Sequence, residues 1–367
     1  MPVPFLDLKL QYQSIKAEVA EAVQDVIRSQ GFVLGPQVQG LEEELAAYLG
    51  VPRAVGVASG TDALLLPLMA LDPEPGDEVV LPAFTFFATA GAVWNAGFKP
   101  VFCDVDPDTF NVTAGTMEAV WTERTRVAVP VHLYGQMAPM EEVRDLASKR
   151  GAFVLEDAAQ AIGASRNGVM AGAVGDAGAF SFFPTKNLGG FGDGGMITTG
   201  DEALADRVAK LRVHGGRQMY HHEMVGTNSR LDALQAAVLR VKLPHLDRWA
   251  QGRRRNAALY DEILGQVEGV QTPVTLPGNH HVYNQYTLKA ERRDDLRRYL
   301  NDRGIGNGLY YPLGLHLQEC FAGLGGAEGD LPATEALTGE VVSLPVFPEL
   351  TEGQVTEVGE AIRVFYQ

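Results

Sequence analysis

The stretch AFVLEDAAQ, residues 152–160, is an apolar run that ends on a charged residue, Asp157. Similar short runs precede it, and stretches with helical periodicity separate them. The runs are AVGVAS (54–59), EVVLP (78–82), PVFCDV (100–105) and RVAVPVHLYG (126–135), and the helical stretches include TDALLLPLMAL (61–71) and MEEVRDLASKRG (140–151). Strands that are almost entirely apolar and alternate with helices predict an α/β fold, with a mostly parallel sheet covered by helices on both faces.

The segments outside this alternation extend the prediction to the rest of the chain. Two helices are expected before the sheet, at residues 14–29 and 38–50. A long helical pair, residues 229–264, is interrupted at Pro244 and leads into a second unit. There the apolar runs YTLKA (286–290), GLYYP (308–312) and VVSLP (341–345) alternate with helices at 292–304 and 351–365. We expect a large domain over residues 1–245 and a small C-terminal α/β domain over residues 246–367.

Composition and charge exclude several classes of protein. The formal net charge of −16 argues against a general basic surface for nucleic acid or an anionic membrane. Two cysteines, Cys103 and Cys320, give no support for a disulfide framework or a metal site. The first residues carry charges, so a signal peptide is not expected, and nowhere do about 18 uncharged apolar residues run together as a membrane span requires. We expect a cytoplasmic protein.

The stretch SFFPTKNLGGFGDGG, residues 181–195, allows two interpretations. Gly190, Gly192 and Gly195 match the spacing G-x-G-x-x-G of a dinucleotide-binding turn, which would make the protein a nucleotide-dependent oxidoreductase. That turn must follow a strand and open a helix, because the pyrophosphate rests on the helix N-terminus. Here the β-branched run MITTG follows the loop, so the context is wrong. The glycines are expected instead to let the chain turn tightly and pass close to a ligand or another subunit.

The second interpretation depends on the single lysine of this loop, Lys186. Asp157 closes a predicted strand of a parallel sheet, and open α/β sheets bind their ligands at the carboxyl ends of the strands. A pyridoxal phosphate enzyme needs a lysine for the Schiff base and an acid that keeps the pyridine nitrogen protonated. Lys186 and Asp157 can fill these two roles, and Ser181 can donate its hydroxyl to the cofactor phosphate.

Two further segments fit the same cofactor. Ser59, Gly60 and Thr61 lie between a strand and a helix, where free backbone N–H groups meet an anion. Phe86 opens the next helix and offers a flat face for the pyridine ring. Each residue also has an ordinary structural alternative: a solvated lysine, a helix-capping aspartate or a core phenylalanine. The interpretation therefore depends on their joint arrangement.

Seven stretches along the chain identify a family. They are FLDLKLQY, SGTDAL, PAFTFFATA, HLYGQ, EDAAQAIGA, SFFPTKNLGGFGDGG and GTNSRLDALQAAVL. Together they resemble the DegT/StrS family of sugar aminotransferases, in order from Phe5 to about Leu344. The resemblance implies the fold type I aminotransferase architecture, with a seven-stranded, mostly parallel sheet between helices. It also implies pyridoxal 5'-phosphate as the cofactor, with pyridoxamine phosphate as its half-reaction form.

The resemblance assigns roles to individual residues. Lys186 would form the Schiff base and move the proton, and Asp157 would pair with the pyridine nitrogen. The remaining cofactor contacts would come from Gly60, Thr61, Phe86, Gln160, Ser181 and Asn228. In the family the asparagine matching Asn228 reaches the phosphate of the neighbouring subunit, which implies a homodimer with shared active sites. Arg230, Tyr310 and Tyr311 would contact the sugar.

The implied reaction is transfer of an amino group from L-glutamate or a similar donor to a keto-sugar nucleotide. The segment RVHGGRQMYHHEMVGTNSRLD (212–232) resembles members that aminate C3 of a nucleoside diphosphate 3-keto-hexose, such as a UDP-2-acetamido-3-keto hexuronic acid. Two alternatives stay open: a 4-keto-sugar aminotransferase, and a non-catalytic regulatory member that retains the cofactor site. Cations for the diphosphate are expected from Arg212, His214, Arg217 and Arg230. The sequence departs from the family's usual HYPxPLH at YYPLGLH (310–316), where Tyr310 and Gly314 replace a histidine and a proline.

Overall fold

The computed structural model describes residues 2–218 and 220–367, and its centre is a seven-stranded sheet. The strands are β1 (Arg53–Val57), β2 (Glu78–Pro82), β3 (Lys99–Cys103), β4 (Thr125–Ala128), β5 (Phe153–Asp157), β8 (Ala177–Ser181) and β9 (Gly195–Thr199). Their order is β1-β9-β8-β5-β4-β2-β3. Only β9 runs antiparallel to its neighbours, β1 and β8. The predicted mostly parallel sheet is confirmed.

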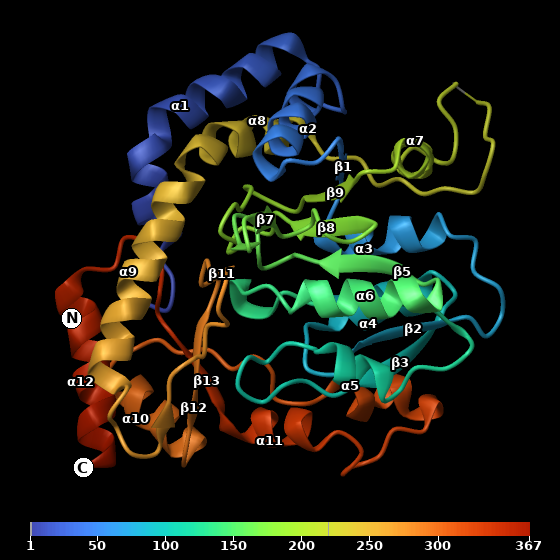
Figure 1. Cartoon of the computed structure of the whole chain (residues 1–367). Coiled ribbons are helices and arrows are strands. Elements are labelled where there is room, and N and C mark those ends of the chain that lie inside the picture. The colour runs from blue at the N-terminus through green and yellow to red at the C-terminus, as the bar shows by residue number, and fades with distance from the viewer. Residues whose placement is uncertain (1, 219) are drawn as a thin grey trace.

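Helices cover both faces of this sheet, as Figure 1 shows. They are α2 (Pro36–Leu49), α3 (Gly60–Met69), α4 (Phe87–Asn95), α5 (Ala114–Glu118), α6 (Met140–Arg150) and α7 (Glu202–Leu211). Alternate strand residues enter two separate cores. Val80 and Val154 pack with α2 and α6, whereas Val79 and Leu155 pack with α3, α4 and α7. Because both faces are buried, the strands are apolar at nearly every position.

A second group of elements packs around its own core beside the sheet. It is linked to the sheet by α1 (Leu8–Ser29), α8 (Ala233–Lys242), the 3-10 turn η2 (Leu243–His245) and α9 (Leu246–Leu264). Its sheet has the order β10-β12-β13, with β10 (Val270–Gln271), β12 (Tyr286–Ala290) and β13 (Val341–Leu344), and is packed by α10 (Arg293–Asp302) and α12 (Glu352–Tyr366). Val3, near the N-terminus, bridges to Ile305 and shares this core with Ile362 of α12, so both ends of the chain belong to this group.

The remaining elements are short. A small sheet of order β11-β6-β7 joins β6 (Ser165–Arg166), β7 (Val169–Met170) and β11 (Asn279–His280). The other helical segments are η1 (Leu133–Gly135), η3 (Leu315–Leu317), η4 (Glu319–Leu324) and α11 (Pro332–Glu340). Within the described ranges, no helix combines the length and the hydrophobicity needed to cross a membrane.

Three expected elements differ from the structure. The run RVAVPVHLYG (126–135), expected as one strand, is a strand only in β4 and ends in the 3-10 turn η1. Helix α1 begins at Leu8 rather than at residue 14, because the side chain of Asp7 accepts a hydrogen bond from Lys9 N and caps the helix earlier. The run GLYYP (308–312) was predicted as a strand, and this is wrong. Only Gly308 pairs with Ser343, and the residues after it leave the sheet to line a pocket. Pro244 interrupts the long helical pair, as predicted, by a 3-10 turn. The domain boundary at residue 245 stays a prediction.

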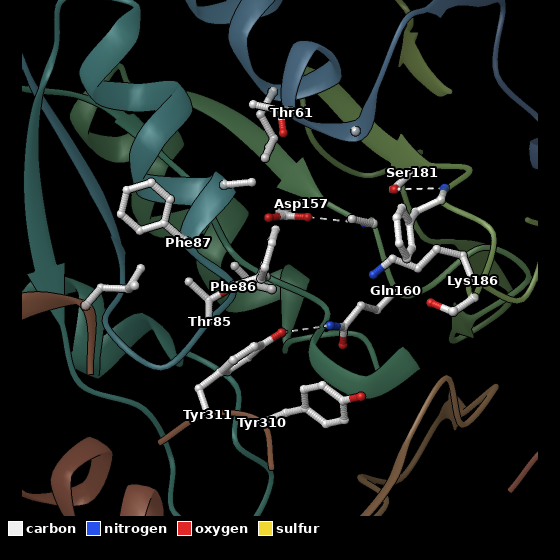
Figure 2. Close-up of a pocket in the computed structure, with 18 of the residues that line it drawn as sticks. Thr61, Thr85, Phe86, Phe87, Asp157, Gln160, Ser181, Lys186, Tyr310 and Tyr311 are labelled. Atoms are coloured by element: carbon white, nitrogen blue, oxygen red, sulfur yellow. Dashed lines mark hydrogen bonds between the residues drawn. The ribbon is translucent and has the colours of Figure 1, made fainter. Parts of the chain in front are cut away.

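The loops that follow the carboxyl ends of the parallel strands enclose a pocket of about 790 Å³ (Figure 2). Residues after β1, β2, β5 and β8 line it, including Gly60, Phe86, Gln160 and Lys186. Parallel strands end at one edge of a sheet, so these distant segments meet there.

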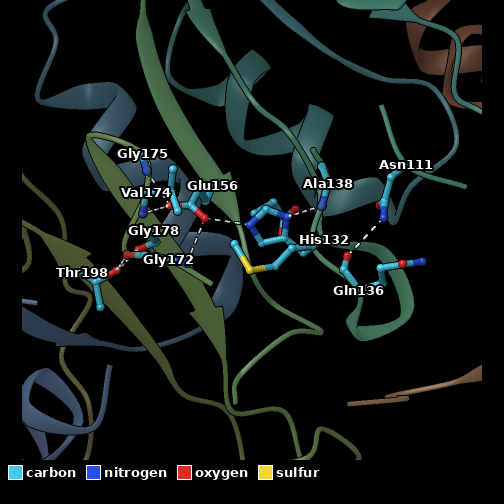
Figure 3. Close-up of polar contacts among 12 residues, drawn as sticks. Asn111, His132, Gln136, Ala138, Glu156, Gly172, Val174, Gly175, Gly178 and Thr198 are labelled. Atoms are coloured by element: carbon cyan, nitrogen blue, oxygen red, sulfur yellow. Dashed lines mark hydrogen bonds and ion pairs between the residues drawn. The ribbon is translucent and has the colours of Figure 1, made fainter. Parts of the chain in front are cut away.

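Glu156, next to Asp157 in β5, holds the loops at this edge of the sheet in place. Its carboxylate is fully buried and accepts hydrogen bonds from Gly172 N, Val174 N and Gly175 N at 2.9, 2.7 and 2.6 Å. His132 Nε2 lies 2.7 Å from the same carboxylate. Figure 3 shows the carboxylate at the centre of these contacts. Glu156 therefore holds two loops, one before β8 and one after β4, against β5.

The protonation state of this pair follows from its partners. His132 Nδ1 accepts a hydrogen bond from Ala138 N at 3.2 Å, so the proton of the neutral imidazole is on Nε2 and is donated to Glu156. Burial alone would raise the pKa of Glu156, but the bonds from His132 and the loop N–H groups lower it overall. The carboxylate is ionised in the folded protein.

Replacement of Glu156 by Ala should destabilise the protein by about 3–5 kcal/mol, because the buried N–H groups and His132 lose their acceptor. Urea denaturation at pH 7 measures this loss, with replacement of the exposed residue Glu142 of α6 by Ala as the control. The folded-state pKa of Glu156 is lowered, so its contribution is present above the ordinary glutamate value of 4.5 and is lost as pH falls below it. The difference in the free energy of unfolding between wild type and Glu156→Ala should therefore become smaller at acid pH. A difference below about 1 kcal/mol at pH 7 would contradict this role.

Candidate active site

Lys186 lies in the loop after β8 and reaches into the pocket. Its backbone N–H donates to Phe183 O at 2.9 Å, which folds the loop back toward the strand end. Figure 2 shows its side chain extending into the space bounded by Asp157, Gln160 and Tyr311. Burial lowers the pKa of Lys186 from 10.5 to about 8, while the charge of Asp157 acts in the opposite direction. About a tenth of the amine is therefore unprotonated, and nucleophilic, at pH 7, far more than for an ordinary lysine.

Asp157 is the last residue of β5, at the predicted strand end. Its side chain accepts from Thr89 Oγ1 at 2.8 Å and from Ala159 N at 3.2 Å. Burial raises the pKa of Asp157, although these bonds and the charge of Lys186 oppose the rise. Within the described part of the chain, no cationic group hydrogen-bonds to this carboxylate. A positively charged ring N–H would supply the missing partner.

Gly60 and Ser181 form a cradle for an anion at the start of α3. Ser59 caps the helix by accepting from Asp62 N at 3.1 Å, which leaves the first N–H groups of α3 free. A Cβ at position 60 would lie 2.6 Å from Ser181 Cβ, so only glycine lets β8 approach this closely. The Thr61 side chain lines the same pocket. Hydroxyls and free N–H groups at a helix N-terminus are suited to a phosphate.

The opposite wall is aromatic. Phe86 is the N-cap of α4 and is 58% exposed although it is a large apolar residue, so one face of its ring is open. Its ring centroid lies 6.3 Å from that of Tyr311. Tyr311 Oη accepts a hydrogen bond from Gln160 Nε2 at 3.2 Å, and Tyr310 lines the pocket beside it. Nine of the eleven predicted site residues thus meet here: Gly60, Thr61, Phe86, Asp157, Gln160, Ser181, Lys186, Tyr310 and Tyr311.

Asn228 and Arg230 do not line this pocket in their own chain. Ser229 between them is buried and donates to Asp62 Oδ2 at 2.8 Å, which ties their segment to the first turn of α3. Asn228 is exposed at that position. This placement agrees with a residue that acts on another subunit, and that role stays a prediction.

The expected cluster of free cations is only partly present. Arg212 is paired with Glu42 and also donates to Gly56 O, and Arg217 is paired with Asp206. Both arginines pair with carboxylates of their own chain, and the expectation that they serve a diphosphate stays a prediction. The sequence pattern could not reveal partners that lie far away along the chain.

The glycines of residues 181–195 serve close packing. Gly195 begins β9, so a strand and not a helix follows the loop, and the dinucleotide interpretation is excluded. A Cβ on Gly190 or Gly192 would lie 2.9 or 2.8 Å from the side-chain amide of Gln235, and one on Gly195 would lie 2.3 Å from a backbone oxygen of Ser59. None of these three glycines has a positive φ. The turns and bends of this loop, at residues 184–188 and 191–192, therefore use ordinary backbone conformations, and the close approach that the structure shows is to the protein's own chain.

Sequence reasoning missed several residues of the site. Thr89 holds Asp157, and Thr85, Thr185, Asp193, Gln285 and Gln318 line the pocket. One signal could have found Thr89: it follows Phe86 by three residues, and residues three apart share one face of a helix. The others lie on loops, where no periodicity indicates which side chains face inward.

Together these groups fit pyridoxal phosphate. The amine of Lys186 has a lowered pKa, the buried carboxylate of Asp157 accepts no hydrogen bond from a cation of the described residues, and a phosphate cradle lies beside them. A metal ion would need a group of at least three His, Cys, Asp or Glu side chains as ligands. No such group is found among residues 2–218 and 220–367.

Comparison with known proteins agrees with this geometry. The chain is 50% identical to a Geobacillus stearothermophilus protein named "Pleiotropic regulatory protein", over 100% of this chain and 99% of the relative. It is 45% identical to a "UDP-N-acetyl-3-dehydro-alpha-D-glucosamine 3-aminotranferase" of Acidithiobacillus ferrooxidans, over 98% and 97% of the two chains. The solved structure of Streptomyces venezuelae DesV in complex with a ketimine intermediate superposes with a TM-score of 0.98, at 45% identity, over 100% of this chain and 99% of that one.

The family model of the DegT/DnrJ/EryC1/StrS aminotransferases matches residues 13–363. Enzymes of this family use pyridoxal phosphate, the cofactor that the pocket fits. The fold type I architecture is confirmed by the solved relatives. The chain belongs to the DegT/DnrJ/EryC1/StrS aminotransferase family and is a pyridoxal phosphate-dependent aminotransferase.

Proposed function

We propose that the protein transfers an amino group from L-glutamate, or a similar donor, to C3 of a nucleotide-linked 3-keto-hexose, such as a UDP-2-acetamido-3-keto hexuronic acid. One observation carries the catalytic part: the amine of Lys186, with a pKa of about 8, shares one pocket with the buried carboxylate of Asp157. When bound, pyridoxal phosphate supplies an electron-accepting ring and a carrier for the amino group.

Lys186 and Asp157 divide the proton chemistry between them. Lys186 holds the cofactor and then moves a proton at its Nζ to and from the substrate carbon. Asp157 holds a proton on the ring nitrogen through its carboxylate, which Thr89 and Ala159 orient. Burial strengthens this electrostatic interaction, because little water screens it.

The other pocket residues orient the cofactor. The free N–H groups at Gly60 and Thr61 and the hydroxyls of Thr61 and Ser181 bind its phosphate. Phe86 presents its open face to the ring. Gln160 points a side-chain N–H into the pocket for the ring oxygen, because its Oε1 already accepts from Tyr134 N at 2.6 Å.

Amination at C3 is supported by the relative named as a 3-aminotransferase, which is 45% identical. A 4-keto substrate remains the alternative on the same pocket. The relative named as a regulatory protein supports a second alternative, a sensor that binds the cofactor without catalysing turnover. A member that only retains the cofactor site would keep Lys186 and Asp157 as well, so conversion of the bound cofactor by glutamate is what distinguishes the two.

The functional unit in this proposal is a homodimer in which Asn228 of one subunit serves the phosphate of the other and Arg230 contacts the sugar. Exposed large apolar side chains, including those of Phe32, Val33 and Phe191, are suited to such an interface. Both cysteines are free thiols, in keeping with a cytoplasmic site for the reaction.

A screen of nucleotide-linked keto-sugars with L-glutamate tests the function. We expect 3-keto-hexose nucleotides to react at least about 100-fold faster, in kcat/KM, than 4-keto ones, since one misplaced hydrogen-bonding group costs about this much. Lys186→Ala should lose turnover by a factor of at least about 10³, while Lys149→Ala, on the exposed end of α6, should not. If glutamate and related donors never convert the bound cofactor to the pyridoxamine form, the regulatory alternative replaces ours.

The rate at which apoprotein binds pyridoxal phosphate covalently should rise with pH with a midpoint of about 8, because only the neutral amine of Lys186 reacts. Stopped-flow absorbance measures this rate. The charge of Asp157 raises the lysine pKa, so Asp157→Asn should move the midpoint to lower pH. A midpoint near the ordinary lysine value of 10.5 would contradict the burial argument.

Shared active sites predict complementation. Lys186→Ala and Asn228→Ala homodimers should both be weak, and mixing them after mild dissociation should restore about a quarter of wild-type activity, because half of the randomly formed dimers would hold one intact site. Steady-state assays of the mixture measure the gain. A mixture no more active than the mean of its two components would show that Asn228 serves its own subunit.

A further inference from the structure

The turn at Leu133–Gly135 holds Tyr134 in an uncommon conformation. Tyr134 has φ of 58°, in the left-handed region that non-glycine residues rarely adopt, and its side chain is 3% exposed. Strain of this kind persists only where surrounding contacts hold it, and it gathers at functional sites. The contacts of Tyr134 therefore indicate what it is held for.

Tyr134 contacts three segments that line the pocket. Its backbone N–H donates to Gln160 Oε1 at 2.6 Å, and its backbone oxygen accepts a hydrogen bond from Gln285 N at 3.4 Å. Its phenol donates to the backbone oxygen of Tyr310. Gln160 follows β5, Gln285 precedes β12 and Tyr310 belongs to the loop after Gly308, so one residue joins parts of the pocket that are far apart in sequence.

The neighbouring glycine makes this junction sterically feasible. Gly135 has φ of 99°, and a Cβ there would lie 2.9 Å from Val282 Cγ2, 3.0 Å from Asn284 N and 3.1 Å from Gln160 O. Val282 N donates to Gly135 O at 3.0 Å. The turn is packed directly against residues 282–285, which leaves Tyr134 little freedom to move.

We propose that Tyr134 is a positioning residue: it sets the position of residues 309–313, the wall loop, relative to Gln160, which forms the floor of the pocket. The position of the wall loop determines how the sugar part of the substrate fits. The inference rests on the proposed function, in which this pocket binds a keto-sugar nucleotide. The phenol acts on the wall loop through Tyr310 O, whereas the backbone N–H acts on the floor through Gln160. The two actions are separable by mutation.

The donor directions support this role. Burial raises the pKa of Tyr134, with Tyr311 acting in the same direction, so the phenol keeps its proton and must be the donor to Tyr310 O. Because Gln160 Oε1 is used by Tyr134 N, its Nε2 donates to Tyr311 Oη at 3.2 Å. Tyr311 then accepts from Gln160 and has its own O–H free to donate to a ligand. Tyr134 thus fixes both ends of the Gln160–Tyr311 pair.

Tyr134→Phe tests the proposal, because it removes the phenol's contacts with Tyr310 O and Thr287 and keeps the ring against Phe110 and the backbone N–H on Gln160. Tyr260→Phe is the matched control. Tyr260 is also fully buried and donates to a backbone oxygen, Pro345 O at 2.9 Å, but in the core of the second group of elements and away from the pocket.

We expect KM for the keto-sugar nucleotide to rise about fivefold to tenfold in Tyr134→Phe, the effect of one lost hydrogen bond, with the glutamate half-reaction changed less than about twofold. Hydrogen exchange of a peptide covering residues 308–315, in which Gly308 N and Leu315 N donate to Ser343 O and Ala83 O, should become about fivefold faster by the same reasoning. Tyr260→Phe should change neither. Equal behaviour of the two variants, or equal losses in both half-reactions, would overturn the proposal. If wild type aminates no keto-sugar, the proposed function fails, and the exchange measurement still decides whether Tyr134 holds the wall loop.

Discussion

Glu156 and Asp157, neighbours at the end of β5, point to opposite faces of the sheet. The site depends on both carboxylates being buried. Glu156 faces α2 and α6 and collects hydrogen bonds from His132 and from three N–H groups of the loop before β8. Asp157 faces α4 and is oriented by Thr89. Because Glu156 is fully satisfied, it can remain ionised inside the protein and lock the strand end. Asp157 accepts no hydrogen bond from a cation within the described residues, and this leaves its carboxylate available for a charged ring.

Close approach of backbones is the second requirement, and it explains where the glycines lie. Gly60 lets β8 come against the start of α3, and Gly195 lets β9 come against Ser59 O. These contacts bring Ser181 and the free N–H groups of α3 to one place. A side chain at either position would separate the elements and open the anion cradle. At Gly314 a Cβ would lie 2.7 Å from the ring of His316, so a proline there would require this ring to shift.

Electrostatics inside the pocket follow from local donors and not from the overall charge of −16. Backbone N–H groups and hydroxyls serve the anionic end, while Lys186 and Asp157 oppose each other at the reacting end. Arg212 and Arg217 pair with carboxylates of the same chain. An acidic protein can thus hold an anionic cofactor, because a few oriented dipoles in a buried site outweigh distant surface charges.

The sequence by itself determined the alternation of strands and helices, the strand end at Asp157 and the rejection of a dinucleotide turn, because periodicity, apolar runs and the residues after Gly195 are local properties. It also placed Lys186, Phe86 and the start of α3 on loops that a parallel sheet must bring to one edge. Only the tertiary structure decided that GLYYP leaves the sheet, that Gln235 and Ser59 occupy the space beside the glycines, and that Tyr134 joins three walls of the pocket. These features arise from contacts between residues far apart in the chain, and no local pattern encodes such partners.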